Sequence, residues 1–480
     1  MTLRRVSLHA DSGSGADTAG LRAAFDAIRI EFQIPATFPP AVLAEAQSAA
    51  VATPRPQRDE TAVEFVTIDP PGSMDLDQAM ALGRDGSGYR VRYAIADVPA
   101  FVVAGGAIDV EARARVETLY LPDARSPLHP PVLSEEAASL LPGVDRPAYV
   151  WDLRLDAASQ VTGVEVYRAL VRSRARFDYA GVQADIDSGR APEGLALLAE
   201  IGTKRQALEI ARGGASLPMP EQEVVVDQGG RYTLRYRPSL PAEEWNAQIS
   251  LMTGMAAATL MLGGQVGILR TMPEPDPQAL TQFRRTVAAM GASWPQDQTY
   301  GAFLRGLDQA NAAHLAIIHE ATTLFRGAGY TPFDAEMPAQ RVHAAVAAPY
   351  AHVTAPLRRL VDRFGLAVCA ALSAGEPVPQ WARAALPQLA GLMRAGDQRA
   401  AAVARACRDA AEAAELSGRI GQEFDAVVVD DRGSKGSLVA LTDPAILAPC
   451  TDRAEPGTTV RVRLTAADLL ERTVRFEVVR

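Results

Sequence analysis

The chain is poor in cysteine and lysine, and it carries no excess of positive charge. Its three cysteines, Cys369, Cys407 and Cys450, lie far apart without a Cys-x-x-Cys pair, which argues against a disulfide framework and a zinc ribbon. Only Lys204 and Lys435 are lysines among the 48 basic residues. The formal net charge is -9, so any binding of nucleic acid must use local patches rather than a global basic field.

Long apolar runs are also scarce. Residues 245–269 carry no charge and could span a bilayer in length, but they include polar residues and the helix-breaking pair Gly263-Gly264. We therefore predict a buried core helix that leads into a strand, and no membrane span. The sequence has no apolar signal core at its start, no Walker loop and no Gly-x-Ser-x-Gly elbow. We expect a cytoplasmic protein, a monomer, without a nucleotide cofactor.

The patterning predicts an α+β chain of several domains. Residues 1–55 are expected to form a small helical module, with helices at 17–32 and 41–51. It could be a helix-turn-helix RNA contact or simply packing for the next domain. Residues 56–418 mix strands with helices, and residues 419–480 show five short β segments that suggest an OB-type barrel.

The expected elements follow from apolar periodicity. Strands are expected at residues 63–68, 79–82, 89–96, 148–155 and 164–172, and in the last domain at 424–429, 435–440, 446–448, 459–464 and 474–479. Helices are expected at residues 108–118, 192–212, 241–262, 277–290, 356–373 and 397–416.

Three carboxylates are brought together around a tight turn. The apolar run 63–68 ends at Asp69, a Pro-Pro-Gly turn follows, and Asp75 and Asp77 are two residues apart, so both project to one side of an extended chain. Carboxylates at close range repel, which implies a cation between them, and oxygen-only ligands suit Mg²⁺ or Mn²⁺. The alternative is that Asp beside Pro and Gly is ordinary turn chemistry.

The string TIDPPGSMDLDQAMAL at residues 67–82 resembles the signature of the RNB-domain exoribonucleases, the ribonuclease II and ribonuclease R family. In that family Thr-Ile-Asp and a short turn precede Asp-x-Asp-Asp. Asp69, Asp75 and Asp77 stand on three of the four acidic positions, and Gln78 stands on the fourth. The resemblance implies that all four residues are metal ligands, since a Gln oxygen can also coordinate a hard cation.

A second segment, Tyr-Ala-His-Val-Thr-Ala-Pro-Leu-Arg-Arg-Leu-Val-Asp at residues 350–362, carries the resemblance further. Pro356 fits the first turn of a helix capped by Thr354, which would place Arg358 near the N-terminus, where an anion is favoured. An ordinary amphipathic helix with its arginines in water is the alternative. The resemblance implies that Arg358 clamps the scissile phosphate and that Asp362 forms a structural pair with a neighbouring arginine.

Aromatic and basic side chains complete the expected site. By the resemblance, Tyr120 and Tyr179 line the RNA path, although each could be a half-buried ring with its hydroxyl satisfied. Alternating arginines on one strand suggest a phosphate track: Arg168, Arg172, Arg174 and Arg176. The residues assigned to RNA binding are Tyr120, Tyr179, Arg176, Arg358 and Arg359.

The fold that the resemblance implies is a mixed α/β RNB catalytic domain followed by a C-terminal OB-fold β-barrel. The implied activity is processive 3′→5′ hydrolysis of single-stranded RNA to nucleoside 5′-monophosphates, with Asp75, Asp77 and Arg358 as catalytic residues. Two alternatives stay open. Gln78 suggests a catalytically weakened or inactive RNA-binding protein of the same fold, and a metal-dependent DNA nuclease would differ only in its substrate.

Overall fold

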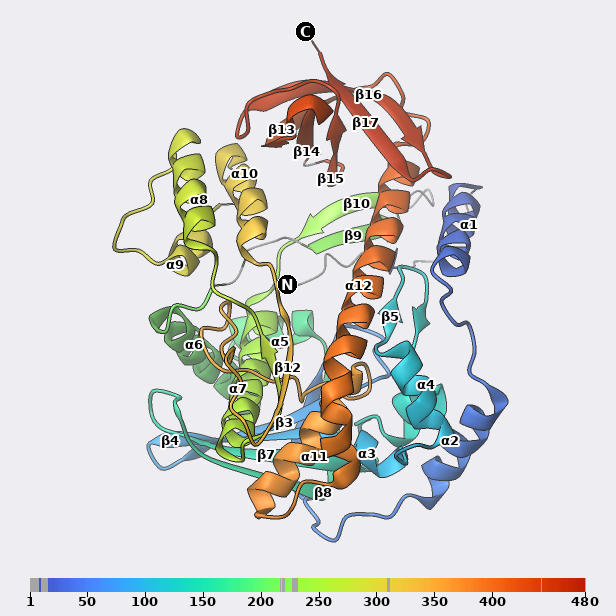
Figure 1. Cartoon of the computed structure of the whole chain (residues 1–480), viewed down its shortest axis with the longest axis vertical. Coiled ribbons are helices and arrows are strands. Elements are labelled where there is room, and N and C mark those ends of the chain that lie inside the picture. Colours follow the sequence, from blue (N-terminus) through green and yellow to red (C-terminus); the bar gives the residue numbers. More distant parts are fainter. Residues whose placement is uncertain are drawn as a thin grey trace.

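The computed structural model describes residues 8–9, 16–215, 217, 221–226, 232–308, 311–441 and 443–479. This part of the chain contains two closed β-barrels. One barrel lies at the lower end of the view in Figure 1, the other lies beside the C-terminus, and the long helix α12 (Gln380–Leu416) runs between them.

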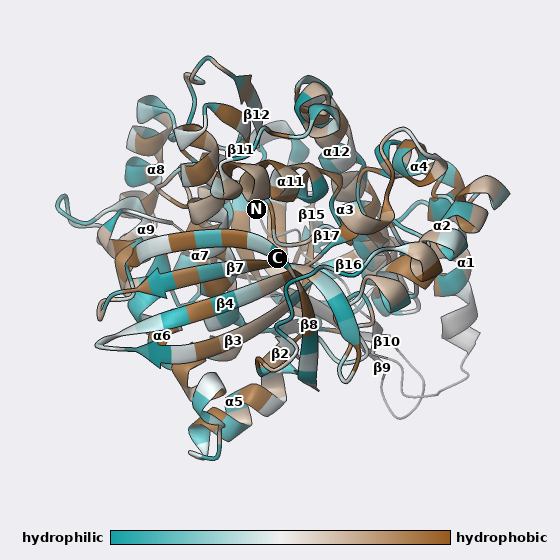
Figure 2. Ribbon diagram, turned by 90° about the horizontal axis from the view of Figure 1, so that it is seen from below, coloured by the Kyte–Doolittle hydropathy of each residue, from teal (hydrophilic) through white to brown (hydrophobic). Residues whose placement is uncertain are grey.

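The first barrel has the strand order β2-β3-β4-β7-β8. Its strands are β2 (Phe65–Ile68), β3 (Gln78–Asp85), β4 (Gly88–Ala96), β7 (Asp145–Leu155) and β8 (Val161–Phe177). Neighbouring strands are antiparallel except β2 and β8, which are parallel. Figure 2 shows β3, β4 and β7 side by side. All five strands that the alternation predicts are confirmed, and β8 extends beyond its predicted range at both ends.

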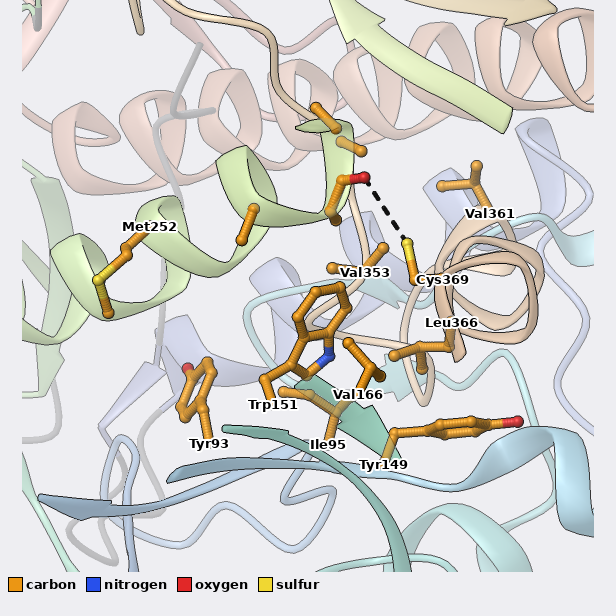
Figure 3. Close-up of a cluster of buried hydrophobic side chains, with 14 of the residues drawn as sticks. Tyr93, Ile95, Tyr149, Trp151, Val166, Met252, Val353, Val361, Leu366 and Cys369 are labelled. Atoms are coloured by element: carbon orange, nitrogen blue, oxygen red, sulfur yellow. Dashed lines mark hydrogen bonds between the residues drawn. The ribbon is translucent and has the colours of Figure 1, made fainter. Parts of the chain in front are cut away.

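The main core lies between this barrel and the helices α7 (Pro241–Gly263) and α11 (Leu360–Ala374), as Figure 3 shows. Trp151 of β7 is fully buried and lies near Leu366 of α11 in that view. The Cys369 thiol donates a hydrogen bond across the core to the Ala257 carbonyl oxygen of α7 (3.7 Å). Pleated strands and one helical face thus bury their apolar residues against each other, which is the dominant favourable term in folding.

The uncharged stretch 245–269 is the predicted core helix followed by a strand: α7 leads into β11 (Val266–Thr271). A Cβ atom added at Gly254 would lie 2.7 Å from the Ala351 carbonyl oxygen and closer still to Tyr350, so only glycine lets this segment approach α7. Ala351 donates its N–H to the Gly254 carbonyl oxygen (3.0 Å). In the described part of the chain, no helix combines the length and apolar character needed to cross a membrane.

The second barrel confirms the five-stranded domain predicted at the C-terminus. Its order is β13-β14-β15-β17-β16. The strands are β13 (Glu423–Asp431), β14 (Ser437–Leu441), β15 (Ile446–Cys450), β16 (Thr459–Asp468) and β17 (Thr473–Val478). Phe424 and Phe476, the two aromatic residues of the domain, meet edge to face in its core (5.8 Å between ring centroids) and are buried. Neither ring is therefore available for stacking on a base.

The two N-terminal helices bury their apolar faces in different cores. Leu21 and Phe25 of α1 (Ala16–Glu31) join the core of α12 and the second barrel. Val42 and Ala46 of α2 (Pro40–Ala52) join the core of the first barrel. Both helices are confirmed, and each serves as packing. The boundaries drawn at residues 55 and 418 stay predictions, and the start of the first predicted module lies outside the described residues.

The remaining elements connect these parts. Helices over the first barrel and beside it are α3 (Val98–Phe101), α4 (Ala107–Arg115), α5 (Tyr179–Asp187) and α6 (Glu193–Ala211), with the π-helical turn η1 (Val132–Ala137). A helical cluster with its own core contains α8 (Pro277–Ala289), α9 (Tyr300–Arg305), α10 (Ala312–Ala321) and the 3₁₀ turn η2 (Thr322–Leu324). Short sheets pair β1 (Leu8–His9) with β9 (Glu221–Val226) and β10 (Tyr232–Arg237), β5 (Leu119–Tyr120) with β6 (Arg125–Ser126), and β11 with β12 (Gly329–Asp334). The 3₁₀ turn η3 (Gly433–Lys435) precedes β14.

Truncation of Leu366 tests the packing of α11 on the first barrel. Leu366 is fully buried, so Leu366→Ala should lower the free energy of unfolding by about 2–5 kcal/mol through lost burial and the cavity left behind. Chemical denaturation measures the change. Val110→Ala removes methyl groups from an exposed side chain and should change stability by less than about 0.5 kcal/mol. Equal losses in the two variants would contradict the described core.

Candidate functional site

The acidic stretch, residues 69–77, connects the antiparallel strands β2 and β3 and forms with them an acidic hairpin. Asp69 directly follows β2, and the chain then turns with Gly72 at a φ of 80°, a backbone angle that glycine adopts without strain. Asp75 and Asp77 lie on the return segment just before β3 begins. The turn places the three carboxylates close enough for Asp75 to raise the pKa values of Asp69 and Asp77.

Ser139 anchors this return segment. Its hydroxyl donates to the Met74 carbonyl oxygen (2.6 Å) and accepts the Leu76 N–H (3.0 Å). The Leu76 side chain is fully buried in the core of the barrel. Asp75 and Asp77 flank Leu76, and their projection to one side of the chain stays a prediction.

Asp77 connects the hairpin to the distant segment that contains Arg358. Its Oδ1 accepts the Leu357 N–H (2.7 Å) and its Oδ2 accepts from Arg358 Nε (3.1 Å). The Asp77 side chain is only 4% exposed. Burial raises the pKa of Asp77 to about 8, against the opposing effects of Arg358 and the Leu357 N–H. The carboxyl therefore binds a proton readily at neutral pH unless a further cation compensates its burial.

Asp69 has the fewest contacts of the three carboxylates with the described residues. Its side chain forms no hydrogen bond with any residue that the structure describes, although it is half-buried. Burial raises its pKa to about 7, the Arg358 guanidinium opposes this, and the Asp75 carboxylate adds to the rise. A half-buried carboxylate without a donor is a natural ligand for a cation.

Asp75 is held by two donors that the sequence did not reveal as a pair. Arg125 Nη1 donates to Asp75 Oδ1 (2.5 Å), and the Tyr120 hydroxyl donates to Oδ2 (3.2 Å). Arg125 Nη2 also contacts Glu135 (2.9 Å). Tyr120 and Arg125 are register partners in the short β5–β6 pair, which turns both side chains toward the hairpin. Sequence reasoning missed Arg125 because nothing in its neighbourhood predicts that pairing.

Gln78, the residue on the fourth acidic position, makes two hydrogen bonds. Its Nε2 donates to the Thr354 carbonyl oxygen (2.6 Å), and its Oε1 accepts the Tyr93 hydroxyl (2.7 Å). Its role as a metal ligand stays a prediction, and the Tyr93 bond competes with it for the amide oxygen.

The helix expected over residues 356–373 starts later, at Leu360. A turn precedes it, in which the Arg358 N–H donates to the Ala355 carbonyl oxygen (3.2 Å). The Ala355 N–H donates to the Asp362 carboxylate (2.7 Å). The predicted helix start at Pro356, with Thr354 as its cap, is therefore wrong: Arg359 is the N-cap residue, and Arg358 lies just before it. Side-chain carboxylates satisfy N–H groups of this segment, so it does not need to enter the helix.

The two arginines of this turn are held differently. Arg358 is bonded to Asp77 through Nε alone, and its terminal nitrogens form no hydrogen bond with the described residues. Its side chain is 35% exposed. Arg359 donates to both oxygens of Asp362 (2.9 and 2.7 Å), which confirms the structural pair expected for that aspartate. Of the two, Arg358 has the guanidinium edge that a ligand can reach; RNA binding by Arg359 stays a prediction.

The predicted aromatic and basic residues lie around the hairpin. Tyr179 begins α5, and its hydroxyl accepts from Asn246 Nδ2 (3.1 Å). Burial raises the pKa of Tyr179 to about 12, so its hydroxyl stays protonated. Arg176 is exposed and donates to the Ser73 carbonyl oxygen in the turn (2.8 Å). These contacts fit the structural alternative for Tyr179 as well as the RNA path.

The alternating arginines of β8 form a shorter basic stretch than the sequence suggested. Arg168 pairs with Asp97 (2.6 Å), and Arg172 pairs with Asp145 (2.6 Å). Arg174 and Arg176 instead contact backbone oxygens, so their positive charges are not neutralised by a contacting carboxylate in the described part of the chain. Unneutralised positive charge on β8 is therefore limited to Arg174 and Arg176, at the end of the strand nearest the acidic hairpin.

The donor chemistry of the site suits a hard cation. Asp69, Asp75 and Asp77 offer only oxygen, and burial raises the pKa of two of them toward neutrality. Within the described ranges, no three His, Cys, Asp or Glu side chains are already arranged as a metal site. Asp75 and Asp77 contact arginines, which leaves Asp69 as the carboxylate most open to a cation. The oxygen ligands that these carboxylates offer are therefore of the kind that a divalent cation such as Mg²⁺ prefers.

Carboxylates on a closed barrel contact a half-buried arginine, and a small five-stranded barrel follows; this arrangement suits a protein that acts on a polyanion. A family model of the RNB domain matches residues 57–365, and a model of the RNase II-type exonuclease C-terminal S1 domain matches residues 422–479. Because the first match covers more than half of the chain, the protein belongs to the RNB-domain family, as its motifs suggested.

Curated relatives resemble the chain over much of its length. Ribonuclease R of Escherichia coli (strain K12) is 28% identical over 370 residues, which cover 72% of this chain and 44% of that protein. Ribonuclease R of Aquifex aeolicus is 26% identical over 430 residues, 84% of this chain and 60% of that protein. The chain thus spans about half of the length of these relatives.

Solved structures share the fold. Mycoplasma genitalium RNase R, solved in complex with ribose methylated single-stranded RNA, has a TM-score of 0.85 at 19% identity and covers 96% of this chain and 78% of its own. Yeast Ssd1, described as a pseudonuclease, has a TM-score of 0.68 at 15% identity and covers 89% of this chain and 55% of its own. At such identities the likeness shows the fold alone.

The raised pKa values of Asp69 and Asp77 predict a pH dependence of stability in metal-free protein. The folded carboxyls keep their protons up to about pH 7 and about pH 8, whereas unfolded aspartate ionises near pH 4. The folded state binds more protons in that window, so the free energy of unfolding should fall as the pH rises from about 4 to about 8. Asp77→Asn removes one contributor and should flatten the slope.

Denaturation in EDTA between pH 5 and pH 9 measures these slopes. Asp85→Asn changes an exposed carboxylate at the far end of β3 and should keep the wild-type slope. An Asp77→Asn slope equal to that of the wild type would contradict the raised pKa of Asp77.

Proposed function

We propose that the chain is a processive 3′→5′ exoribonuclease that hydrolyses single-stranded RNA to nucleoside 5′-monophosphates with a divalent cation. The observation that carries this proposal is the contact between Asp77 and Arg358, which brings one buried and two half-buried carboxylates near a guanidinium. Cleavage of a phosphodiester calls for both charges: anionic oxygens that hold a cation, and a fixed positive group that faces the phosphate.

The cation would be held by Asp69, Asp75 and Asp77, as Mg²⁺ or Mn²⁺. When bound, it would lower the pKa of a water molecule and neutralise charge on the non-bridging phosphate oxygens. Ser139 fixes the return segment of the hairpin, which carries Asp75 and Asp77. Asp77, the most buried of the three, is the carboxylate whose loss should affect activity most.

Arg358 would bind the scissile phosphate. Asp77 fixes the Nε edge of its guanidinium, and its terminal nitrogens form no hydrogen bond with described residues, so both can donate to phosphate oxygens. The guanidinium is oriented before the substrate arrives and does not need to reorganise as charge develops at phosphorus. Asp77 thereby serves two tasks in the proposal, as a ligand and as the support of Arg358.

Single-stranded RNA is the proposed substrate. Two similar structures are Mycoplasma genitalium RNase R in complex with single-stranded and with double-stranded RNA. The Tyr120 hydroxyl donates to Asp75. Burial, and then the Asp69 carboxylate, raise the pKa of Tyr179, so both rings lie near the carboxylates. RNA bases would stack on these two rings. Contacts to 2′-hydroxyls would select RNA over DNA.

A catalytically weakened or inactive RNA-binding protein of the same fold is the second candidate. Gln78 in place of a fourth acid favours it, and a pseudonuclease shares the fold. Asp69, Asp75, Asp77 and Arg358 favour the enzyme, since a binding protein gains nothing from three carboxylates beside a polyanion.

A cytoplasmic location and a monomeric state belong to the same proposal. Cys369, Cys407 and Cys450 are all free and buried, which suits a reducing compartment. Sedimentation of the purified chain measures its oligomeric state.

A degradation assay tests the enzyme against the binding protein. A 5′-labelled single-stranded RNA should shorten from its 3′ end and release nucleoside 5′-monophosphates with Mg²⁺ but not with EDTA. Asp77→Asn should slow this by about 10³-fold, because the amide removes an anionic ligand and the support of Arg358, while Asp85→Asn should behave as wild type. Tight RNA binding without degradation by the wild type would favour the second candidate. Equal cleavage of a matched DNA strand would contradict selection of RNA.

Replacement of Arg358 by lysine tests its proposed role. Arg358→Lys keeps the charge but loses the fork, so the single-turnover rate should fall by about 10²-fold while RNA affinity changes much less. Arg154→Lys makes the same exchange at an exposed arginine near the far end of β7 and should keep the wild-type rate. A large loss of RNA affinity with an unchanged single-turnover rate would contradict the proposed role of Arg358.

A further inference from the structure

The side chain of Gln78 joins the acidic hairpin to the turn that carries Arg358. Its Nε2 lies 2.6 Å from the Thr354 carbonyl oxygen. A carbonyl oxygen can only accept a hydrogen bond, so the amide nitrogen must face it. The Thr354 hydroxyl is held from a second element, by Ser250 of α7 (2.8 Å). The backbone and the side chain of Thr354 are thus each fixed by a different part of the fold.

The oxygen of the same amide is also engaged. Tyr93 is fully buried on the neighbouring strand, and its hydroxyl donates to Gln78 Oε1 (2.7 Å). Burial raises the pKa of Tyr93 well above its usual value, so the phenol keeps the proton that it donates. A carboxylate at position 78 could accept from Tyr93, but it would have no N–H group for Thr354.

Two adjacent residues, Asp77 just before β3 and Gln78 at its start, therefore hold both ends of one turn. Gln78 donates to the Thr354 carbonyl at the start of the turn, and Asp77 accepts the Leu357 N–H and the Arg358 side chain at its end. We propose that Gln78 is a positioning residue that fixes this turn, and with it Arg358, and that it is not a ligand of the cation. The effect of Gln78 on catalysis rests on the proposed function, whereas its role in holding the turn does not.

The inference predicts a nuclease site with three carboxylate ligands. At the fourth acidic position of the motif, this chain has an amide whose donor supports the turn. A carboxylate there would bring an anionic oxygen against the Thr354 carbonyl oxygen, which repels it. Gln78 thus need not mark a lost active site, because the group that replaces the acid has its own structural task.

Gln78→Glu separates the two roles, because it keeps the size and an oxygen acceptor, removes the N–H donor, and adds the charge that an acid at this position of the motif would carry. As a positioning residue, Gln78 holds the turn whose Leu357 N–H is bonded to Asp77. Hydrogen exchange of the Leu357 amide should therefore be about tenfold faster in Gln78→Glu. The variant should not bind Mn²⁺ more tightly than wild type in a titration. With RNA as substrate, kcat should fall about tenfold or more with little change in KM.

Gln160→Glu is the matched control, since it adds the same charge in an exposed turn at the far end of the barrel and should leave all three readouts unchanged. Should Gln78→Glu fail to fold, Gln78→Met removes both hydrogen bonds without adding charge, and the same faster exchange of the Leu357 amide is expected. Tighter Mn²⁺ binding by Gln78→Glu with unchanged Leu357 exchange would overturn the proposal. The exchange and Mn²⁺ readouts need no RNA, so they decide the role of Gln78 even if the wild type proves inactive.

Discussion

The hydrogen bonds of the Asp77 carboxylate are the interaction on which the site depends. They join the acidic hairpin to Arg358, 281 residues away in the sequence. Burial alone would make this carboxylate costly, and the Leu357 N–H and the Arg358 guanidinium offset part of that cost. The two halves of the proposed chemistry, cation binding and phosphate binding, are therefore held together by one side chain.

Charge balance explains why the carboxylates differ. Asp75 is compensated by Arg125, Asp77 is only partly compensated by Arg358, and Asp69 has no hydrogen-bond donor in the described part of the chain. A site built in this way is short of positive charge, and a divalent cation would supply it. The same balance holds Arg358 by one edge and leaves its other edge for an anion. Stability and the proposed activity therefore depend on the same groups.

Much of this arrangement could be predicted from local sequence. Alternating apolar residues predicted the barrel strands, because alternation depends only on neighbours along the chain. The contact of Arg125 with Asp75 could not be predicted, since it arises from the register of β5 and β6. The late start of α11 could not be predicted either, since the turn before it is held by side chains from elsewhere in the fold: the Asp362 carboxylate accepts the Ala355 N–H, and the Asp77 carboxylate accepts the Leu357 N–H. The periodicity of apolar residues does not predict which polar groups pair across the fold.

A double-mutant cycle tests the central claim that Asp77 and Arg358 act as one unit. Single-turnover hydrolysis of RNA would be compared among the wild type, Asp77→Asn, Arg358→Lys and the double variant. The account predicts that the double variant is about as slow as the slower single variant, because each change already breaks the shared contact. Losses that multiply in the double variant would show two independent groups and would contradict the account.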